Sequence, residues 1–198
     1  ADHIEIDSSG NVLVGALAST TDLGYMTLIV KYDTEGRELW AVRSERTGAI
    51  LSNPFEPVAM ALDQEANVYV AAGDTLVKRD TTGKLVLDFY ADLDSLSSVV
   101  VDRSGVYVAG SSNRFVITLK YDAAGNEIWR AHYDEQSPWD GTAAALAVDP
   151  ADGSVCVTGL SGGAYATVKY DGAGNQLWAR RIEGYQLDFN RLDRKGAL

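Results

Sequence analysis

The chain has 198 residues, enough for one globular domain with a buried core or for part of a larger one. Its formal net charge of −11 argues against nucleic acid and anionic membrane surfaces as partners, because both require a cationic face. No apolar run approaches the roughly 18 residues of a membrane span, so we expect no membrane insertion.

The first predicted element is a pair of short strands near residues 4–6 and 12–14, joined by a turn from Asp7 to Gly10. Short alternating runs rich in Val, Ile, Tyr and Thr and bounded by Gly and Asp predict β-strands. The same half-unit returns at residues 60–70, 99–110 and 146–159. We find no helical period, and the sequence therefore predicts an all-β chain.

The second half-unit is a Lys-Tyr-Asp-x-x-Gly-x-x-x-Trp motif that occurs three times. Its copies span residues 31–40, 120–129 and 169–178. A degraded copy at residues 78–87 carries Leu87 in place of the tryptophan. Each copy predicts a strand, a tight turn and a second strand whose tryptophan packs between neighbouring units, where burial of the ring is worth about 3 to 5 kcal/mol.

The turns predict a structural role for the repeated aspartates. A side chain such as Asp7 accepts backbone N–H groups at the start of a turn, and the glycine three residues later tolerates a positive φ. One copy has Ala66 in place of this glycine. Equivalent aspartates in separate units lie too far apart to share one ion, so we expect turn capping and assign no metal ligand.

Four short strands in each repeat of about 40 to 50 residues indicate a β-propeller. We expect four four-stranded blades and the start of a fifth, because residues 192–198 repeat the pattern of residues 101–107. The chain is then a piece of a larger propeller, and a closed four-bladed ring is the alternative. The expected repeats span approximately residues 1–56, 57–96, 97–142, 143–184 and, in part, 185–198.

The two half-units together resemble the bacterial β-propeller repeat family called SBBP. This resemblance implies a ring of about six to eight blades, a secreted or cell-surface location in bacteria, and no catalytic residue or cofactor to carry over. The Asp-x-x-Gly-x-x-x-Trp stretch also resembles the tryptophan-docking motif of quinoprotein propellers. The interval from Asp33 to Gly36 is one residue shorter than in that motif.

The variable segments are the expected binding surface. The short turns all lie on one face of a propeller, whereas the longer loops lie on the other face and differ in every repeat. Trp139, beside Asp140 in a Pro/Gly-containing loop, is suited to stack on a sugar or to anchor a peptide, and packing over a blade edge is its structural alternative. The candidate ligand-binding residues are Trp139, Asp140, Tyr25, Phe55, Tyr165 and Tyr185.

The sequence offers no catalytic constellation. The two histidines, His3 and His132, lack a zinc-ligand spacing, and no nucleophile elbow is present. Our leading hypothesis is a non-catalytic extracellular scaffold that binds a protein or a glycan through its variable loops. An enzyme, a lyase or hydrolase with carboxylates at the central funnel, is the alternative, and a self-assembling module of a filament or surface layer is a third hypothesis.

Overall fold

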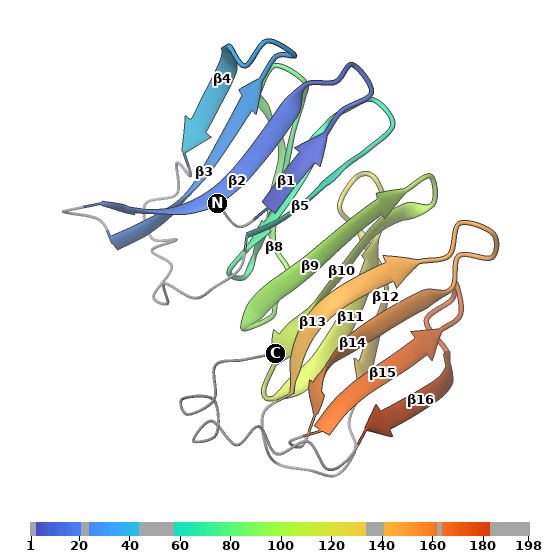
Figure 1. The fold of residues 1–198 in the computed structure, drawn as a ribbon. Coiled ribbons are helices and arrows are strands. Elements are labelled where there is room, and N and C mark those ends of the chain that lie inside the picture. Colours follow the sequence, from blue (N-terminus) through green and yellow to red (C-terminus); the bar gives the residue numbers. More distant parts are fainter. Residues whose placement is uncertain (1–2, 21–23, 44–57, 134–140, 162–163, 183–198) are drawn as a thin grey trace, which may run out of the picture.

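The computed structural model describes residues 3–20, 24–43, 58–133, 141–161 and 164–182. These residues form four antiparallel sheets of four strands each (Figure 1). Within these ranges, no helix is long and apolar enough to cross a bilayer.

We call the sheets blades 1 to 4 in chain order. Blade 1 contains β1 (His3–Ile6), β2 (Val12–Thr20), β3 (Gly24–Tyr32) and β4 (Glu38–Arg43). Blade 2 contains β5 (Val58–Leu62), β6 (Val68–Ala72), β7 (Thr75–Arg79) and β8 (Leu85–Tyr90). Blade 3 contains β9 (Ser95–Asp102), β10 (Gly105–Ser112), β11 (Phe115–Tyr121) and β12 (Glu127–Tyr133). Blade 4 contains β13 (Thr142–Val148), β14 (Val155–Ser161), β15 (Ala164–Tyr170) and β16 (Gln176–Ile182).

Every blade is a meander in which strands adjacent in sequence pair in the sheet. The registers are equivalent from blade to blade: in blade 1, Leu13 lies opposite Lys31, which lies opposite Trp40. All four blades also have a register shift directly after the repeated lysine, where the third strand pairs with the fourth. Such a bulge increases the local twist of a strand, so the repeated motif also encodes the shape of each outer strand.

The blades stack face to face, and apolar side chains fill the space between them. The first strands lie side by side in the order β1, β5, β9 and β13. Separate clusters occupy the interfaces between blades 1 and 2, 2 and 3, and 3 and 4, with Leu13, Leu119 and Tyr170 among their buried members. Because both faces of an inner blade are covered, its second strand, β6 in blade 2 and β10 in blade 3, is largely apolar on both sides, unlike strands with one solvated face.

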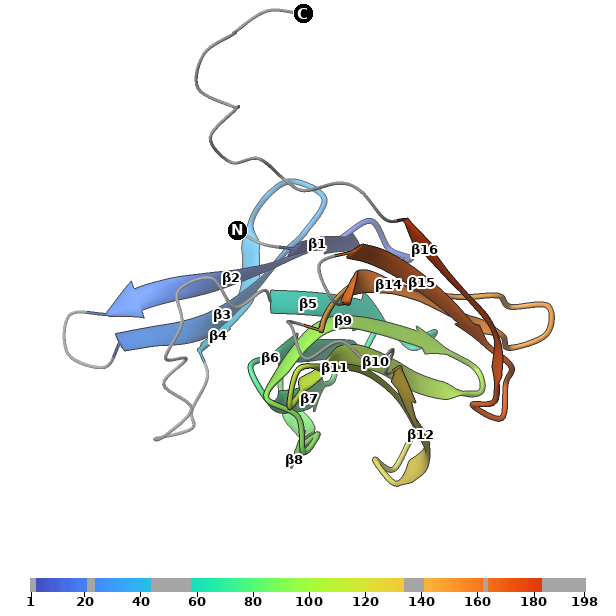
Figure 2. The ribbon, with the colours of Figure 1, turned by 90° about the horizontal axis from the view of Figure 1, so that it is seen from below.

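This arrangement confirms the predicted all-β propeller with four four-stranded blades. The described blades form an open row (Figures 1 and 2), without the packing of blade 4 against blade 1 that a closed four-bladed ring requires. The expected start of a fifth repeat, residues 185–198, lies outside the described residues.

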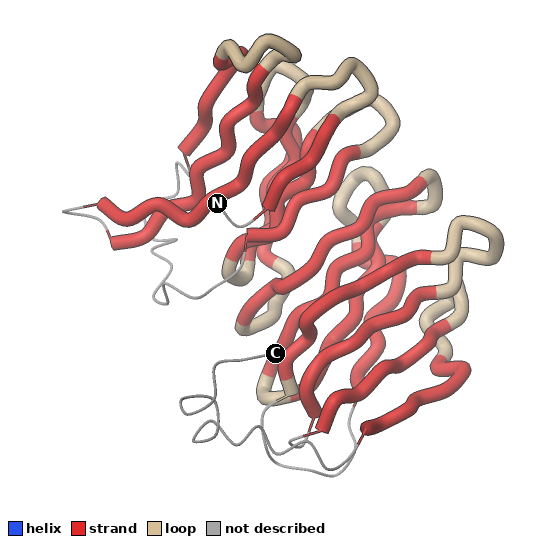
Figure 3. The backbone as a smooth tube through the Cα atoms, in the orientation of Figure 1, coloured by secondary structure: helices blue, strands red, loops and turns tan. Residues whose placement is uncertain are grey.

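The short turns that join the first two and the last two strands of each blade lie on one side of the row, as the sequence predicted (Figure 3). We call this side the turn face. Glycines end most of these turns with φ near +80°, for example Gly10 and Gly36. Ala66 adopts the same left-handed conformation with φ of 61°, which costs a residue with a side chain about 1 to 2 kcal/mol.

Candidate functional site

The aspartates of the turn face are engaged in holding their own turns. In blade 1, Asp7 Oδ1 accepts hydrogen bonds from the backbone N–H groups of Ser9 and Asn11, both at 2.9 Å. The predicted turn capping is thereby confirmed. The same pair of bonds is made by Asp33, Asp63, Asp80, Asp122 and Asp171.

In blades 1 and 2 the repeated lysine joins the two turns of a blade through an ion pair. Lys31 Nζ lies 2.8 Å from Asp7 Oδ2, with both side chains less than 5% exposed, and Lys78 Nζ lies 3.0 Å from Asp63 Oδ2. Burial alone would raise the pKa of Asp7, but hydrogen bonds from Lys31, Asn11 and Ser9 outweigh it and lower the pKa to about 2. This carboxylate therefore stays ionised at neutral pH.

Blade 3 uses the same positions differently. Lys120 lies over the Tyr107 ring, 4.9 Å from its centroid, and no ion pair joins it to Asp102 within the described part of the chain. Asp102 Oδ1 instead accepts hydrogen bonds from the N–H and hydroxyl of Ser104 and from the N–H of Gly105. In blade 2, Lys78 lies over the Tyr69 ring as well and still pairs with Asp63, so blade 3 keeps the contact with the ring but lacks the ion pair among its described residues.

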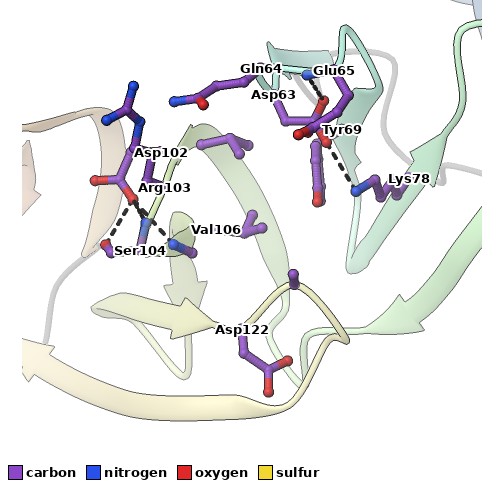
Figure 4. Close-up of a pocket in the computed structure, with 13 residues that line it drawn as sticks. Asp63, Gln64, Glu65, Tyr69, Lys78, Asp102, Arg103, Ser104, Val106 and Asp122 are labelled. Atoms are coloured by element: carbon purple, nitrogen blue, oxygen red, sulfur yellow. Dashed lines mark hydrogen bonds and ion pairs between the residues drawn. The ribbon is translucent and has the colours of Figure 1, made fainter.

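A cleft opens on the turn face between blades 2 and 3 (Figure 4). It has a volume of about 320 Å³ and continues toward Leu62 and Pro150 as a second hollow of about 390 Å³. The two hollows share five lining residues: Asp63, Gln64, Val101, Asp102 and Arg103. The cleft is therefore built from blades 2 and 3, and Pro150 of blade 4 joins the lining of the second hollow.

Gln64 and Arg103 are two exposed residues with hydrogen-bond donors at the rim of this cleft. Their turns lie on opposite sides of the opening (Figure 4). Neither side chain makes a hydrogen bond or an ion pair with another described residue, so the Gln64 amide and the Arg103 guanidinium are available to a ligand. Asp102, Asp122 and Glu65 add carboxylates around the same opening.

The buried carboxylate of the cleft is poorly placed for acid catalysis. Burial raises the pKa of Asp63, but hydrogen bonds from Asn67 and Lys78 lower it further than burial raises it. A general acid requires the opposite shift, toward neutral pH. The described residues also contain no group of three His, Cys, Asp or Glu side chains placed to hold a metal ion.

Of the sequence-predicted binding residues, only Tyr165 has a described side chain, and it does not line this cleft. Tyr165 is 44% exposed at the loop end of β15, away from the turn face. Tyr25 belongs to β3, but its side chain is outside the described part of the chain. Four other candidates lie entirely outside the described residues: Phe55, Trp139, Asp140 and Tyr185. Sequence reasoning missed Gln64 and Arg103 because they stand inside repeated turns. The signal that could have pointed there is the break in the repeat at Leu87.

The fold and its repeated turns define a β-propeller repeat protein. A family model described as outer membrane protein assembly factor BamB matches residues 26–186, and the chain belongs to this family. No curated protein matched the chain in a comparison of sequences.

Several solved structures share the fold. A protein of unknown function from Bacteroides caccae has a TM-score of 0.59 at 9% identity over 87% of this chain and 58% of that one. A chain of a nidogen/laminin complex gives 0.54 at 14% identity, covering 87% and 61%. The Dos1 propeller gives 0.58 at 13% identity, covering 91% and 50%. The chain thus spans between half and about three fifths of these structures, and the likeness shows the fold alone.

Proposed function

We propose that this chain is a non-catalytic propeller scaffold that binds a polypeptide segment of a partner protein in the turn-face cleft. One observation carries the proposal: Arg103 and Gln64 face an open cleft without partners among the described residues. The capping aspartates around them are already engaged in fixing the turns. Preformed polar groups on a rigid surface are what a binding site requires, since little ordering accompanies binding.

The chemistry of the cleft favours a polypeptide over a glycan. Sugar rings are commonly held by exposed aromatic faces, yet the one aromatic ring in the described lining, Tyr69, is buried beneath Lys78. A main chain presents carbonyl and N–H groups that suit a guanidinium and an amide at the rim. The family is described as an assembly factor, and one structural neighbour was solved in a complex with another protein, which also supports this choice.

The sequence-derived expectations complete the proposal. The repeats are of the SBBP type, and the protein acts at the bacterial cell surface or outside the cell; detection in the envelope and secreted fractions, rather than in the cytoplasm, tests this placement. The loop face is a second contact surface for the same partner. Tyr165 is the candidate residue of the loop face whose side chain the structure describes.

Panning a displayed peptide library on the chain, followed by calorimetry with the selected peptide, tests the cleft. We expect Gln64→Ala combined with Arg103→Ala to weaken binding at least about tenfold, or about 1.4 kcal/mol. Arg37→Ala is the matched control: it also removes an exposed arginine beside a turn, but in blade 1 and outside the cleft lining. We expect it to change the affinity less than about twofold.

Two results would contradict the proposal. If the cleft variant binds as tightly as the unmodified chain while Tyr165→Ala abolishes binding, the loop face is the site. If no peptide is selected and a glycan array gives binding that the cleft variant loses, the partner class is wrong. Thermal unfolding of each variant verifies that the blades remain folded.

A further inference from the structure

One carboxylate of the cleft, Asp102, keeps an oxygen that its equivalents in the two preceding blades have engaged. In blade 1, Asp7 Oδ2 accepts a hydrogen bond of 2.9 Å from Asn11 Nδ2 and lies 2.8 Å from Lys31 Nζ. The equivalent aspartate of blade 2 repeats both contacts. All three hydrogen bonds of Asp102 go to Oδ1. Its Oδ2 has no hydrogen bond or ion pair with any described residue and is open to a ligand.

The free oxygen results from a turn that is one residue shorter than its counterpart in blade 1. Three residues separate Asp102 from Val106. In blade 1 four residues separate Asp7 from Val12, and the last of them is Asn11. Val106 and Val12 hold equivalent places, because each lies opposite the tyrosine that ends the third strand of its blade. The deleted residue is therefore the asparagine that would have bonded Oδ2.

The lining of the cleft carries an excess of negative charge. Four carboxylates and two cations line the first hollow. Lys78 is already paired with Asp63 at 3.0 Å. The Arg103 guanidinium then faces three carboxylates, which stand on separate turns around the opening (Figure 4): Glu65, Asp102 and Asp122. A cationic side chain is the occupant whose charge complements this lining.

The second hollow offers an apolar wall beside the same carboxylate. Leu62, Val101 and Pro150 contribute to its lining. Asp102 belongs to the lining of both hollows, and so does Val101. Long basic side chains cover apolar surface with their methylene groups while the charged end stays at a polar partner. The two hollows together therefore suit one side chain with an apolar stem and a cationic end.

The hydrogen bonds of Asp102 favour lysine over arginine as this side chain. A guanidinium is held best by both oxygens of one carboxylate, through two parallel hydrogen bonds. Asp102 Oδ1 already accepts three hydrogen bonds, so only Oδ2 is open. An ammonium group needs one oxygen for each of its hydrogen bonds and can direct the others to neighbouring acceptors. A single free oxygen therefore matches an ammonium group better than a guanidinium.

We propose that the polypeptide segment bound in the cleft contributes a lysine, whose ammonium group pairs with Asp102 Oδ2 and whose methylene groups lie on Val101 and Leu62. This inference rests on the proposed function and adds the charge of the ligand to it. Arg103 and Gln64 hold the main chain of the same segment beside the lysine. The partner is then a protein with an exposed basic segment, whose association the net charge of −11 accelerates.

The peptides selected by panning on the chain are the probe for the first test. We expect a lysine to recur at one position among them. Replacing this lysine by norleucine keeps the apolar stem but removes the ammonium group, and should weaken binding measured by calorimetry at least about fivefold. Replacing it by arginine should weaken binding about two- to fivefold, because only one oxygen of Asp102 is open. Both changes leave the protein itself unaltered, so folding does not affect the result.

Variants of the protein provide the second test. Asp102→Asn should weaken binding of the lysine peptide at least about fivefold and that of the norleucine peptide less than about twofold, because only the first peptide has a charge to pair. Asp33→Asn is the matched control: it removes the same charge from a capping aspartate of blade 1, outside the cleft lining. We expect it to change the affinity for the lysine peptide less than about twofold.

Three results would overturn the inference. Selected peptides without a recurring lysine, or with one that norleucine replaces at no loss, do not use the pair. Equal losses in Asp102→Asn and Asp33→Asn would show general attraction of a cation to an acidic chain. A recurring acidic residue whose contribution Arg103→Ala removes would reverse the charge of the ligand. In all three results a peptide still binds the cleft and the proposed function stands, whereas failure to select any peptide would overturn both.

Discussion

The interface between blades 2 and 3 differs from its two neighbours in how it is docked. On either side a tryptophan covers the glycine of the next turn and donates a hydrogen bond to it. Between blades 2 and 3, Leu87 and Phe89 contact Gly125 instead. Phe89 also packs edge-on against Tyr121 of blade 3, with ring centroids 4.8 Å apart. Leu87 and Phe89 thus occupy the place of the indole, but neither side chain has an N–H group that could donate a hydrogen bond to the turn.

The interface without a tryptophan, between blades 2 and 3, is also the one at which the cleft lies. Ala123 follows Asp122 just as Thr81 follows Asp80. The Ala123 carbonyl is therefore equivalent to the Thr81 carbonyl, which accepts the hydrogen bond from Trp40 Nε1. Asp122 and Ala123 both line the cleft. Leu87 is shorter than an indole and carries no N–H group, so it cannot donate a hydrogen bond to this carbonyl. The repeat is therefore broken at a turn that borders the cleft.

The largest expected effect on stability comes from removing a tryptophan that packs between two blades. Trp129→Ala should lower the free energy of unfolding by about 3 to 5 kcal/mol, because it leaves Gly174 uncovered and removes the bond to Gly172. Leu87→Ala should cost roughly 1 to 2 kcal/mol, since Leu87 is half-buried and Phe89 still covers Gly125. Urea unfolding followed by circular dichroism measures both.

Equal losses in these two variants would contradict the comparison, because they would mean that the middle interface depends on Leu87 as strongly as its neighbours depend on their tryptophans. Ile128→Ala is the control for Trp129→Ala. It changes the exposed neighbour of Trp129 on the same strand, and we expect an effect within about 0.5 kcal/mol.

The second prediction compares the stability lost in blade 1, which has a buried ion pair, with that lost in blade 3, which has none among its described turn residues. Asp7→Asn leaves the Lys31 ammonium buried without a counter-charge and should cost about 3 kcal/mol near pH 7. Asp102→Asn should cost about 1 kcal/mol, because it weakens hydrogen bonds but strands no charge.

The pH dependence follows from the lowered pKa of Asp7, about 2 against an ordinary value of 3.8. A carboxyl with a lowered pKa in the folded state contributes its full stabilisation above the unfolded-state value and loses it as the pH falls through the folded-state value. The unmodified chain should therefore lose this stabilisation between about pH 4 and about pH 2. Asp7→Asn should show a weaker loss over the same window, and an unchanged acid profile would contradict the assignment.

The sequence predicted the parts of this molecule that repeat. The turn caps at Asp7 and its equivalents and the packing of Trp40 and Trp129 between blades follow from local motifs, whose physics acts within a few residues or at one fixed contact. The cleft could not be predicted in this way. It depends on how turns of separate blades, carrying Gln64 and Arg103, face each other once the blades are stacked.

The smallest expected effect on stability, and the most direct test of the comparison, comes from restoring the repeat. Leu87→Trp combined with Phe89→Val gives blade 2 the pair that blade 1 carries as Trp40 and Val42. The new indole should cover Gly125 and donate to the Ala123 carbonyl, so the free energy of unfolding should change by less than about 1 kcal/mol. Leu87→Trp alone should cost about 1 to 3 kcal/mol, because Phe89 already occupies part of that space. The double variant should also narrow the cleft and weaken the selected peptide, whereas an affinity that stays unchanged would show that Leu87 has no part in opening it.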